Sequence, residues 1–181
     1  MSTKYSIQNI SSLQNRRVFF DANVLIYIFW PSGAYFLEKS YSSAFGKLLR
    51  QKNELLVDFI VLSEAINRSH RLEYEKHLMA NDLSKNNLTY KQYRDGSVGQ
   101  TALFDIYLIV NTNILSTFTV IGKSFTKTEI GSFLTLDTLD FADKGILLTC
   151  QENGCVLLTN DIDFKTTEID ILTANLSILR N

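Results

Sequence analysis

The chain has 181 residues, of which 45% are hydrophobic, and this is enough for one domain with a proper core. Its 18 basic and 19 acidic residues leave a net charge of −1, so no general excess of positive charge indicates a nucleic-acid partner. The two cysteines, Cys150 and Cys155, are too few for a disulfide framework and lack neighbouring histidines for a zinc site. Reduced thiols packed in a core are expected.

No segment has the pattern of a secretory signal or a membrane span. Residues 1–17 are polar and lack the apolar run of a signal. The longest apolar stretches, residues 24–30 and 102–110, fall short of the ~20 residues that span a bilayer. We therefore expect one domain over residues 1–181, in the cytoplasm and without a membrane segment.

The first half of the chain alternates between short β-prone runs and helical patterns. Residues 18–20 and 55–57 are expected as strands. Helices are expected at 23–29, at 36–49 and from about residue 61 onward. The order of strand, two helices, strand and helix indicates a parallel sheet.

The second half begins with a polar stretch at 81–99, which we interpret as a loop or a ragged helix. Two helices and two strands follow, expected at 102–114, 140–151, 156–159 and 169–172. Gly154 follows the second of these helices at the position where a left-handed cap is favoured.

Several acidic residues lie at positions that a parallel sheet would bring to the carboxyl ends of its strands. Asp21 and Asp161 each follow an apolar strand, and ligands bind beyond the carboxyl ends of such strands. Glu64 lies early in a helix and Asp143 in the first turn of another, so both can point to the same edge. Gathered carboxylates repel one another, and a hard cation relieves the repulsion. Oxygen ligands alone favour Mg²⁺ or Mn²⁺, which suits cleavage of a nucleic-acid backbone.

Each acid also has a purely structural interpretation. Asp140 fits a helix N-cap, Asp143 a favourable anion in the first turn, Asp21 the start of a helix and Asp163 the turn after a strand. Asp140 and Asp143 are three residues apart and can face the same side of a helix. Either of them can therefore be the third acid of the site.

Several of these segments resemble the motifs of PIN domains. Phe20-Asp21-Ala22-Asn23-Val24-Leu25 resembles the opening motif of that family, and Val61-Leu62-Ser63-Glu64 resembles the segment with its glutamate. Ala142-Asp143-Lys144 with Gly154, and Leu158-Thr159-Asn160-Asp161-Ile162-Asp163-Phe164, resemble the third and fourth acidic motifs. The order and intervals agree along nearly the whole chain.

The resemblance implies a three-layer α/β/α sandwich with a central parallel sheet, Mg²⁺ or Mn²⁺ in an acidic pocket, and cleavage of single-stranded or loop RNA. VapC-like toxins of toxin–antitoxin pairs have this activity, so a cognate antitoxin and a second copy of the chain are candidate partners. The acidic quartet, by position, is Asp21, Glu64, Asp143 and Asp161. Asp143 is preferred to Asp140 because its distance to Gly154 and Asp161 fits the family pattern.

The same resemblance gives roles to neighbouring residues. Asn23 and Thr159 are expected to orient carboxylates or water, and Asp163 is a candidate supplementary ligand. One departure is the stretch at about 70–134, which is long for a compact toxin of this family and predicts a helical elaboration that either holds a partner or only extends a hairpin.

Basic and aromatic side chains near these motifs give candidate RNA contacts. An acidic pocket needs flanking cations to attract a polyanion, and the candidates are Arg68, Arg71, Lys123, Lys127 and Lys144. Tyr90 and Tyr93 can stack on bases, although aromatic packing in a hairpin is commoner. His70 and His77 are expected on the surface, with no chemical role.

Two other classes of protein compete with the nuclease. A haloacid-dehalogenase-like phosphatase also places an aspartate after its first strand, but it needs a second aspartate two residues on, where this chain has Asn23. A receiver-like domain needs paired acids after the first strand, which Phe20-Asp21-Ala22 does not supply. A catalytically silent acidic α/β domain that acts by binding a partner is the remaining alternative.

Overall fold

The computed structural model describes residues 2–180 and shows an α/β fold around one sheet in which all six strands are parallel. The strands lie in the order β1, β6, β5, β2, β3, β4. Their bounds are Lys4–Ser6 (β1), Arg17–Phe20 (β2), Glu54–Val57 (β3), Thr119–Val120 (β4), Val156–Leu158 (β5) and Asp170–Thr173 (β6). The predicted α/β/α sandwich with a central parallel sheet is confirmed.

The central strands β2 and β5 are buried on both faces. The last three residues of β2 and all three of β5 are fully buried, as expected when helices cover both sides of a parallel sheet. The register pairs Phe20 with Leu158, the last residue of each strand. The segments that follow these two residues therefore begin side by side at one edge of the sheet.

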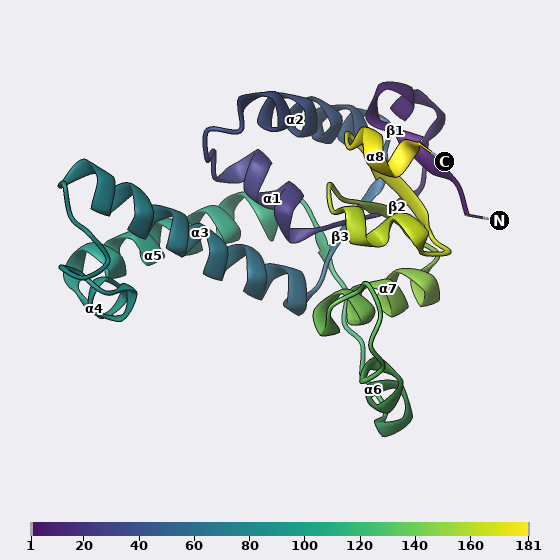
Figure 1. Cartoon of the computed structure of the whole chain (residues 1–181). Helices are drawn as coiled ribbons and strands as arrows, with labels where there is room; N and C mark the ends of the chain where they lie inside the picture. The colour runs from purple at the N-terminus through teal and green to yellow at the C-terminus, as the bar shows by residue number, and fades with distance from the viewer. Residues whose placement is uncertain (1, 181) are drawn as a thin grey trace. The chain divides into compact units, whose positions relative to one another are not determined.

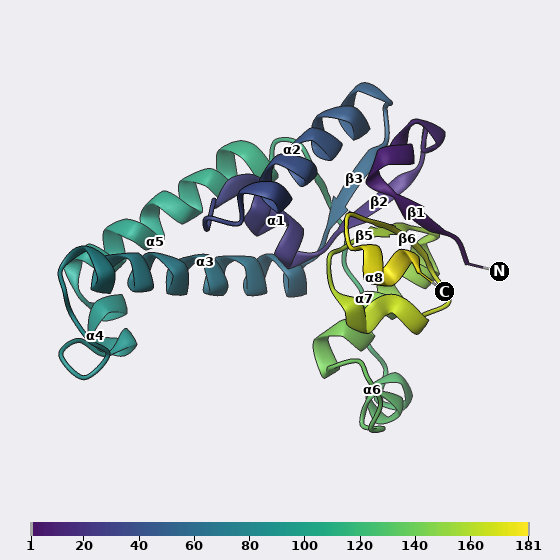
Figure 2. The ribbon, with the colours of Figure 1, turned by 45° about the horizontal axis from the view of Figure 1, so that its top comes forward.

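Helices cover both faces of this sheet, with α1 and α2 on one face and α7 on the other (Figure 1 and Figure 2). The helices in this part of the chain are α1 (Ala22–Phe29), α2 (Tyr35–Arg50), α6 (Lys127–Phe133), α7 (Phe141–Asn153) and α8 (Leu176–Leu179), with short helices η1 (Ile7–Ser12) and η3 (Ile162–Thr166). None of the helices formed by residues 2–180 is long and apolar enough to cross a membrane.

The end of α7 agrees with the sequence in two respects. Gly154 follows the helix with φ 61° and ψ 37°, the left-handed conformation predicted for this position. Cys150 and Cys155 lie on either side of it, and both are buried free thiols, as predicted.

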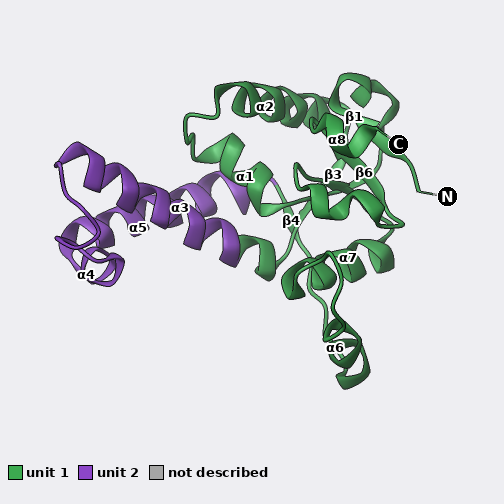
Figure 3. Cartoon of the chain, viewed as in Figure 1, with its two compact units in different colours: residues 1–62, 118–181 green, residues 63–117 purple. Residues whose placement is uncertain are grey.

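The chain divides into two compact units (Figure 3). The sheet unit contains residues 2–62 and 118–180, and the helical unit contains residues 63–117. The predicted helical elaboration at about 70–134 thus corresponds to a helical unit that ends at residue 117. Residues 118–134 belong to the sheet unit, where they form β4 and α6.

The helical unit packs around aromatic residues. It contains most of α3 (Phe59–Ala80), then α4 (Tyr90–Asp95), α5 (Ser97–Ile109) and η2 (Val110–Ile114). Tyr74, Leu78 and Tyr93 form a buried cluster, so Tyr93 is a packing residue. The stretch predicted as a loop or ragged helix contains a regular helix, α4, because Thr89 and Gln92 form a capping box at its start.

His70 corrects the prediction of a surface histidine. Its side chain is buried, with one ring nitrogen 2.9 Å from the Tyr90 hydroxyl and the other 2.9 Å from the Gly99 carbonyl oxygen. A side chain at Gly99 has no room, since an added Cβ would stand 2.1 Å from the Tyr93 carbonyl oxygen. This close approach of α5 to α4 brings the Gly99 carbonyl within reach of His70, and helical spacing alone does not predict it.

Candidate functional site

Asp21 occupies the end of the central strand β2 and caps α1. Its side chain is buried, and its Oδ1 accepts a hydrogen bond from the Ala22 N–H at 2.6 Å. Its Oδ2 accepts from the Asn23 amide and from the Thr159 hydroxyl, both at 2.5 Å. Asn23 and Thr159, which the sequence predicts to orient carboxylates, thus both contact this one.

Thr159 and Asn23 also connect Asp21 to the loop that follows β5. The Thr159 hydroxyl accepts a hydrogen bond from the Asp161 N–H at 2.9 Å, and the Asn23 side-chain oxygen accepts from the Asn160 N–H at 3.2 Å. Because Thr159 is fully buried, water does not compete for its hydroxyl. The two segments that carry Asp21 and Asp161 are therefore held together by side-chain hydrogen bonds.

Asp161 caps the short helix η3 and is half-buried. Its Oδ1 accepts a hydrogen bond from the Asp163 N–H at 3.0 Å. Asp163, the predicted supplementary ligand, is exposed. The structural interpretation that Asp163 serves the turn after the strand agrees with this geometry, and its role as a ligand stays a prediction.

The first turn of α7 brings two more aspartates into the site. Asp140 is the N-cap predicted as its structural role, and its carboxylate accepts from the Asp143 N–H at 2.8 Å. Burial, and after it the charges of Asp140, Asp21 and Asp161, raise the pKa of Asp143 to about 7. The Asp143 carboxyl group therefore interacts electrostatically with the carboxylates that follow both central strands and with the one that caps its own helix.

Asp58 is a buried acid that the sequence analysis missed. It follows β3, the neighbour of β2, and its carboxylate accepts from the Val61 N–H at 2.8 Å at the start of α3. Burial raises the pKa of this carboxyl group. The signal was available, since Asp58 follows an apolar strand in the same way as Asp21.

Glu64, the fourth predicted acid, belongs to the helical unit. Its carboxylate forms an ion pair with Arg68, one turn further along α3, with 3.0 Å between the charged atoms. Arg71 lies over the Tyr90 ring, 4.4 Å from its centroid. The two arginines predicted to contact RNA thus both have interactions within their own unit.

Lys144, the third predicted RNA contact, is a correction to the sequence analysis. Its side chain is buried, and its ammonium group donates to the carbonyl oxygens of Phe133 and Thr135 at 3.0 and 2.5 Å. It also lies 3.0 Å from the Asp137 carboxylate. These three acceptors use the three hydrogens of the ammonium group, so Lys144 holds the segment before α7 instead of facing a phosphate.

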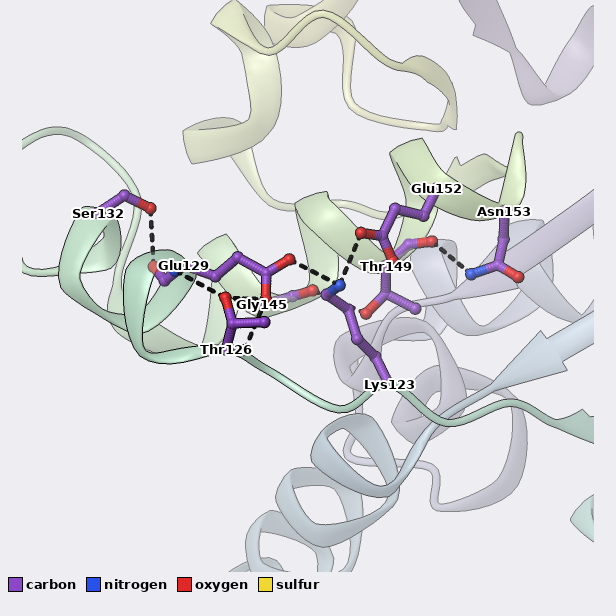
Figure 4. Close-up of polar contacts among 8 residues, drawn as sticks. All are labelled: Lys123, Thr126, Glu129, Ser132, Gly145, Thr149, Glu152 and Asn153. Carbon is purple, nitrogen blue, oxygen red and sulfur yellow. Dashed lines mark hydrogen bonds and ion pairs between the residues drawn. The ribbon is translucent and has the colours of Figure 1, made fainter.

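Lys123 is engaged in a similar way within the sheet unit. Figure 4 shows its ammonium group between Glu129 and Glu152, at 2.9 and 2.6 Å. Glu129 also completes the capping box of α6 with Thr126 (Figure 4). Lys123 thus connects α6 to α7. The sequence analysis considered it only as one of several possible phosphate contacts.

The acids that the structure brings together are Asp21, Asp161, Asp143 and Asp140, at the ends of the central strands and the start of α7. Among residues 2–180, no three His, Cys, Asp or Glu side chains form, as they stand, a group that could hold a metal ion. The chemistry of the donors nevertheless fits a hard cation, because all are carboxylates, and after burial the charges of the other three raise the pKa of Asp143. The predicted ligand set stays a prediction.

Comparison with known proteins adds no relative to this geometry. No model of a known protein family matches the sequence, and no curated protein matches it.

Proposed function

We propose that the chain is a metal-dependent endoribonuclease of the PIN type. The observation that carries the proposal is the set of three aspartates, Asp21, Asp143 and Asp161, which reach one edge of the parallel sheet from distant parts of the sequence. The pKa of Asp143, raised to about 7 by burial and by the other carboxylates, supports a site that is incomplete without a positive charge.

Mg²⁺ or Mn²⁺ is the proposed cofactor, because carboxylate oxygens are the ligands that these ions prefer. Asp21, Asp143 and Asp161 would hold it, with Glu64 and Asp163 as further candidates. When bound, such an ion supplies an activated water molecule and stabilises the charge that develops on a phosphodiester. Asn23 and Thr159 fix the orientation of the Asp21 carboxylate, which limits the rearrangement that binding requires.

The choice of RNA as substrate is supported by the resemblance of four segments to PIN-domain motifs. A toxin of a toxin–antitoxin pair, acting in the cytoplasm with a cognate antitoxin and as a homodimer, is the specific form of this proposal. Arg68 and Arg71 remain the candidate RNA contacts, after exchange of their present partners for phosphates.

Cleavage of a labelled single-stranded RNA by the purified protein tests the proposal. We expect cleavage with Mn²⁺ or Mg²⁺ and none with a chelator. Asp21→Asn and Asp161→Asn should each lower the rate at least about 100-fold, because the ion contributes several kcal/mol and about 1.4 kcal/mol corresponds to a factor of ten.

Glu168→Gln is the matched control, since it removes one negative charge from an exposed position of the same unit. It should cleave at the wild-type rate. Undiminished cleavage in chelator, or wild-type rates in both aspartate variants, would overturn the proposal.

The partner-binding alternative is favoured by one observation, since the Asp21 carboxylate already accepts hydrogen bonds from Ala22, Asn23 and Thr159. Titration with Mn²⁺ distinguishes the two functions, because a silent acidic domain has no need of the ion. The phosphatase alternative has less support, since Asn23 stands where that chemistry needs a second aspartate and its amide donates to Asp21.

A further inference from the structure

Tyr41 is a fully buried residue of α2 whose hydroxyl reaches two loops at the carboxyl edge of the sheet. The oxygen lies 3.1 Å from the Thr159 carbonyl oxygen and 3.0 Å from the Asn160 side-chain oxygen, and its proton is shared between these acceptors. It also accepts from the Ala174 N–H at 3.0 Å. One hydroxyl group thus connects α2 to the segments that follow β5 and β6.

The environment of Tyr41 keeps this hydroxyl fixed and protonated. Its ring stacks on Tyr27, with 5.6 Å between ring centroids and 12° between the planes. Burial raises the pKa of Tyr41 to about 12, so the group remains a hydrogen-bond donor at neutral pH. A neutral, rigid donor is suited to holding a backbone segment in one conformation.

The loop that Tyr41 contacts is the one that joins the acids of the site. The backbone of Thr159 accepts from Tyr41, while its side chain donates to Asp21 and accepts from the Asp161 N–H. The same loop is also held by Asn175, whose side chain donates to the Asn160 carbonyl oxygen at 2.9 Å. Tyr41 is therefore connected to both carboxylates through Thr159, and to Asp21 also through Asn160 and Asn23.

We propose that Tyr41 is a positioning residue of the metal site: its hydroxyl fixes the Thr159–Asn160 backbone and thereby the separation of Asp21 and Asp161. This inference rests on the proposed function, since a separation of carboxylates matters only where both hold one ion. In this proposal Tyr41 acts through Thr159 and Asn160 and supplies no ligand of its own.

The test compares Tyr41→Phe with Tyr74→Phe. The first keeps the stacked ring and removes the hydroxyl from the loop. The second removes a buried tyrosine hydroxyl that donates to the Leu88 carbonyl oxygen within the helical unit. Both variants should lower the melting temperature, because each leaves a carbonyl oxygen without its donor. The loss should be larger for Tyr41→Phe, since its acceptor on Thr159 is buried and the Tyr74–Leu88 bond is only partly buried.

Only Tyr41→Phe should affect the metal. We expect its affinity for Mn²⁺, measured by calorimetry, to fall about 10-fold or more, because outer partners of metal ligands have effects of this size. Its kcat for RNA should fall while KM stays near the wild-type value. Tyr74→Phe should bind Mn²⁺ like the wild type.

Two outcomes overturn the inference in distinguishable ways. If the wild type binds Mn²⁺ and Tyr41→Phe binds it equally well, the positioning role is wrong and the proposed function stands. If the wild type binds no Mn²⁺, the proposed function falls and the positioning role falls with it. Should Tyr41→Phe not fold, Asn160→Ala removes one of the two acceptors, and unchanged Mn²⁺ affinity there overturns the inference equally.

Discussion

The two units differ in the polar groups that they bury, since the buried carboxylates of residues 2–180 lie in the sheet unit. In the helical unit, His70 lies between the Tyr90 hydroxyl and the Gly99 carbonyl, and Tyr74 donates to the Leu88 carbonyl. None of these contacts involves a carboxylate. At the carboxyl edge of the sheet, in contrast, Asp143 is half-buried, and burial together with the charges of the neighbouring carboxylates raises its pKa to about 7.

This difference in buried polar groups bears on the stability of each unit. Buried polar groups that find partners stabilise a fold or are neutral to it, whereas buried like charges destabilise it unless something else compensates. Repulsion between buried like charges is found most often at functional sites. The helical unit is thus described as a packed scaffold, whereas the carboxylates at the edge of the sheet are those assigned to a cation in the proposed function.

The largest expected effect distinguishes two aspartates at the start of α7. Asp143→Ala removes a proposed ligand and should lower RNA cleavage at least about 100-fold without loss of stability. Asp140→Ala removes the N-cap and should lower the free energy of unfolding by about 0.5–2 kcal/mol with activity largely kept. Cleavage assays and urea unfolding of both variants give the answer.

The opposite pattern has a definite meaning. If Asp140→Ala is inactive and Asp143→Ala is active, Asp140 is the third acid and the site must be redrawn around it. If both variants cleave RNA at the wild-type rate, neither carboxylate in the first turn of α7 takes part in catalysis.

A second prediction sharpens the description of the helical unit as a packed scaffold. Gly99→Ala should lower the free energy of unfolding by about 1–3 kcal/mol, because the new Cβ would meet the Tyr93 backbone oxygen at 2.1 Å. Gly131→Ala, in α6, is the control, since an added Cβ meets no heavy atom within 4 Å. It should be neutral or stabilising by up to about 1 kcal/mol. Equal stability of the two variants would show that α4 and α5 are not tightly packed.

The last prediction concerns a difference between two pH profiles of the metal-free protein. The folded-state pKa of Asp143 lies near 7 and its ordinary value near 3.8, so between these values the folded state holds the proton more tightly. Stability should therefore fall as the pH rises from about 4 to about 7 and change no further from this source. Asp58, whose pKa is also raised, acts in the same direction.

Asp143→Asn should lack this part of the profile. Its advantage in stability over the wild type should grow from about pH 4 to about pH 7 and then stay constant, as measured by urea unfolding in chelator. An advantage that is the same at every pH would show that Asp143 ionises normally in the folded protein.

The central part of the fold could be predicted because its signals are local. The strands β2, β3 and β5 are apolar runs, and Asp21 and Asp161 follow two of them within one or a few residues. The cap at Gly154 depends only on the order of neighbouring residues. The edge strands β1 and β4 were missed because segments of three and two residues, each partly exposed, carry no hydrophobic period.

The parts of the site that the sequence did not predict depend on distant residues. Tyr41 lies in the helix predicted at 36–49, but nothing in that pattern indicates its acceptor Thr159, which lies 118 residues further along the chain. Lys144 was interpreted as a phosphate contact because it adjoins an acidic motif, but the carbonyl oxygens of a folded segment hold it. Such partners are set by the tertiary fold, whereas the caps and strands are set by neighbours.

The lengths of the outer strands bear on how the protein behaves at high concentration. β1 has three residues and β4 has two, so each edge of the sheet offers few backbone N–H and C=O groups to a strand of another molecule. Long, flat edges are templates for aggregation and fibre formation, and short edges are one of the ways in which natural proteins avoid it. A sheet whose long strands are all interior should thus remain resistant to growth from its sides.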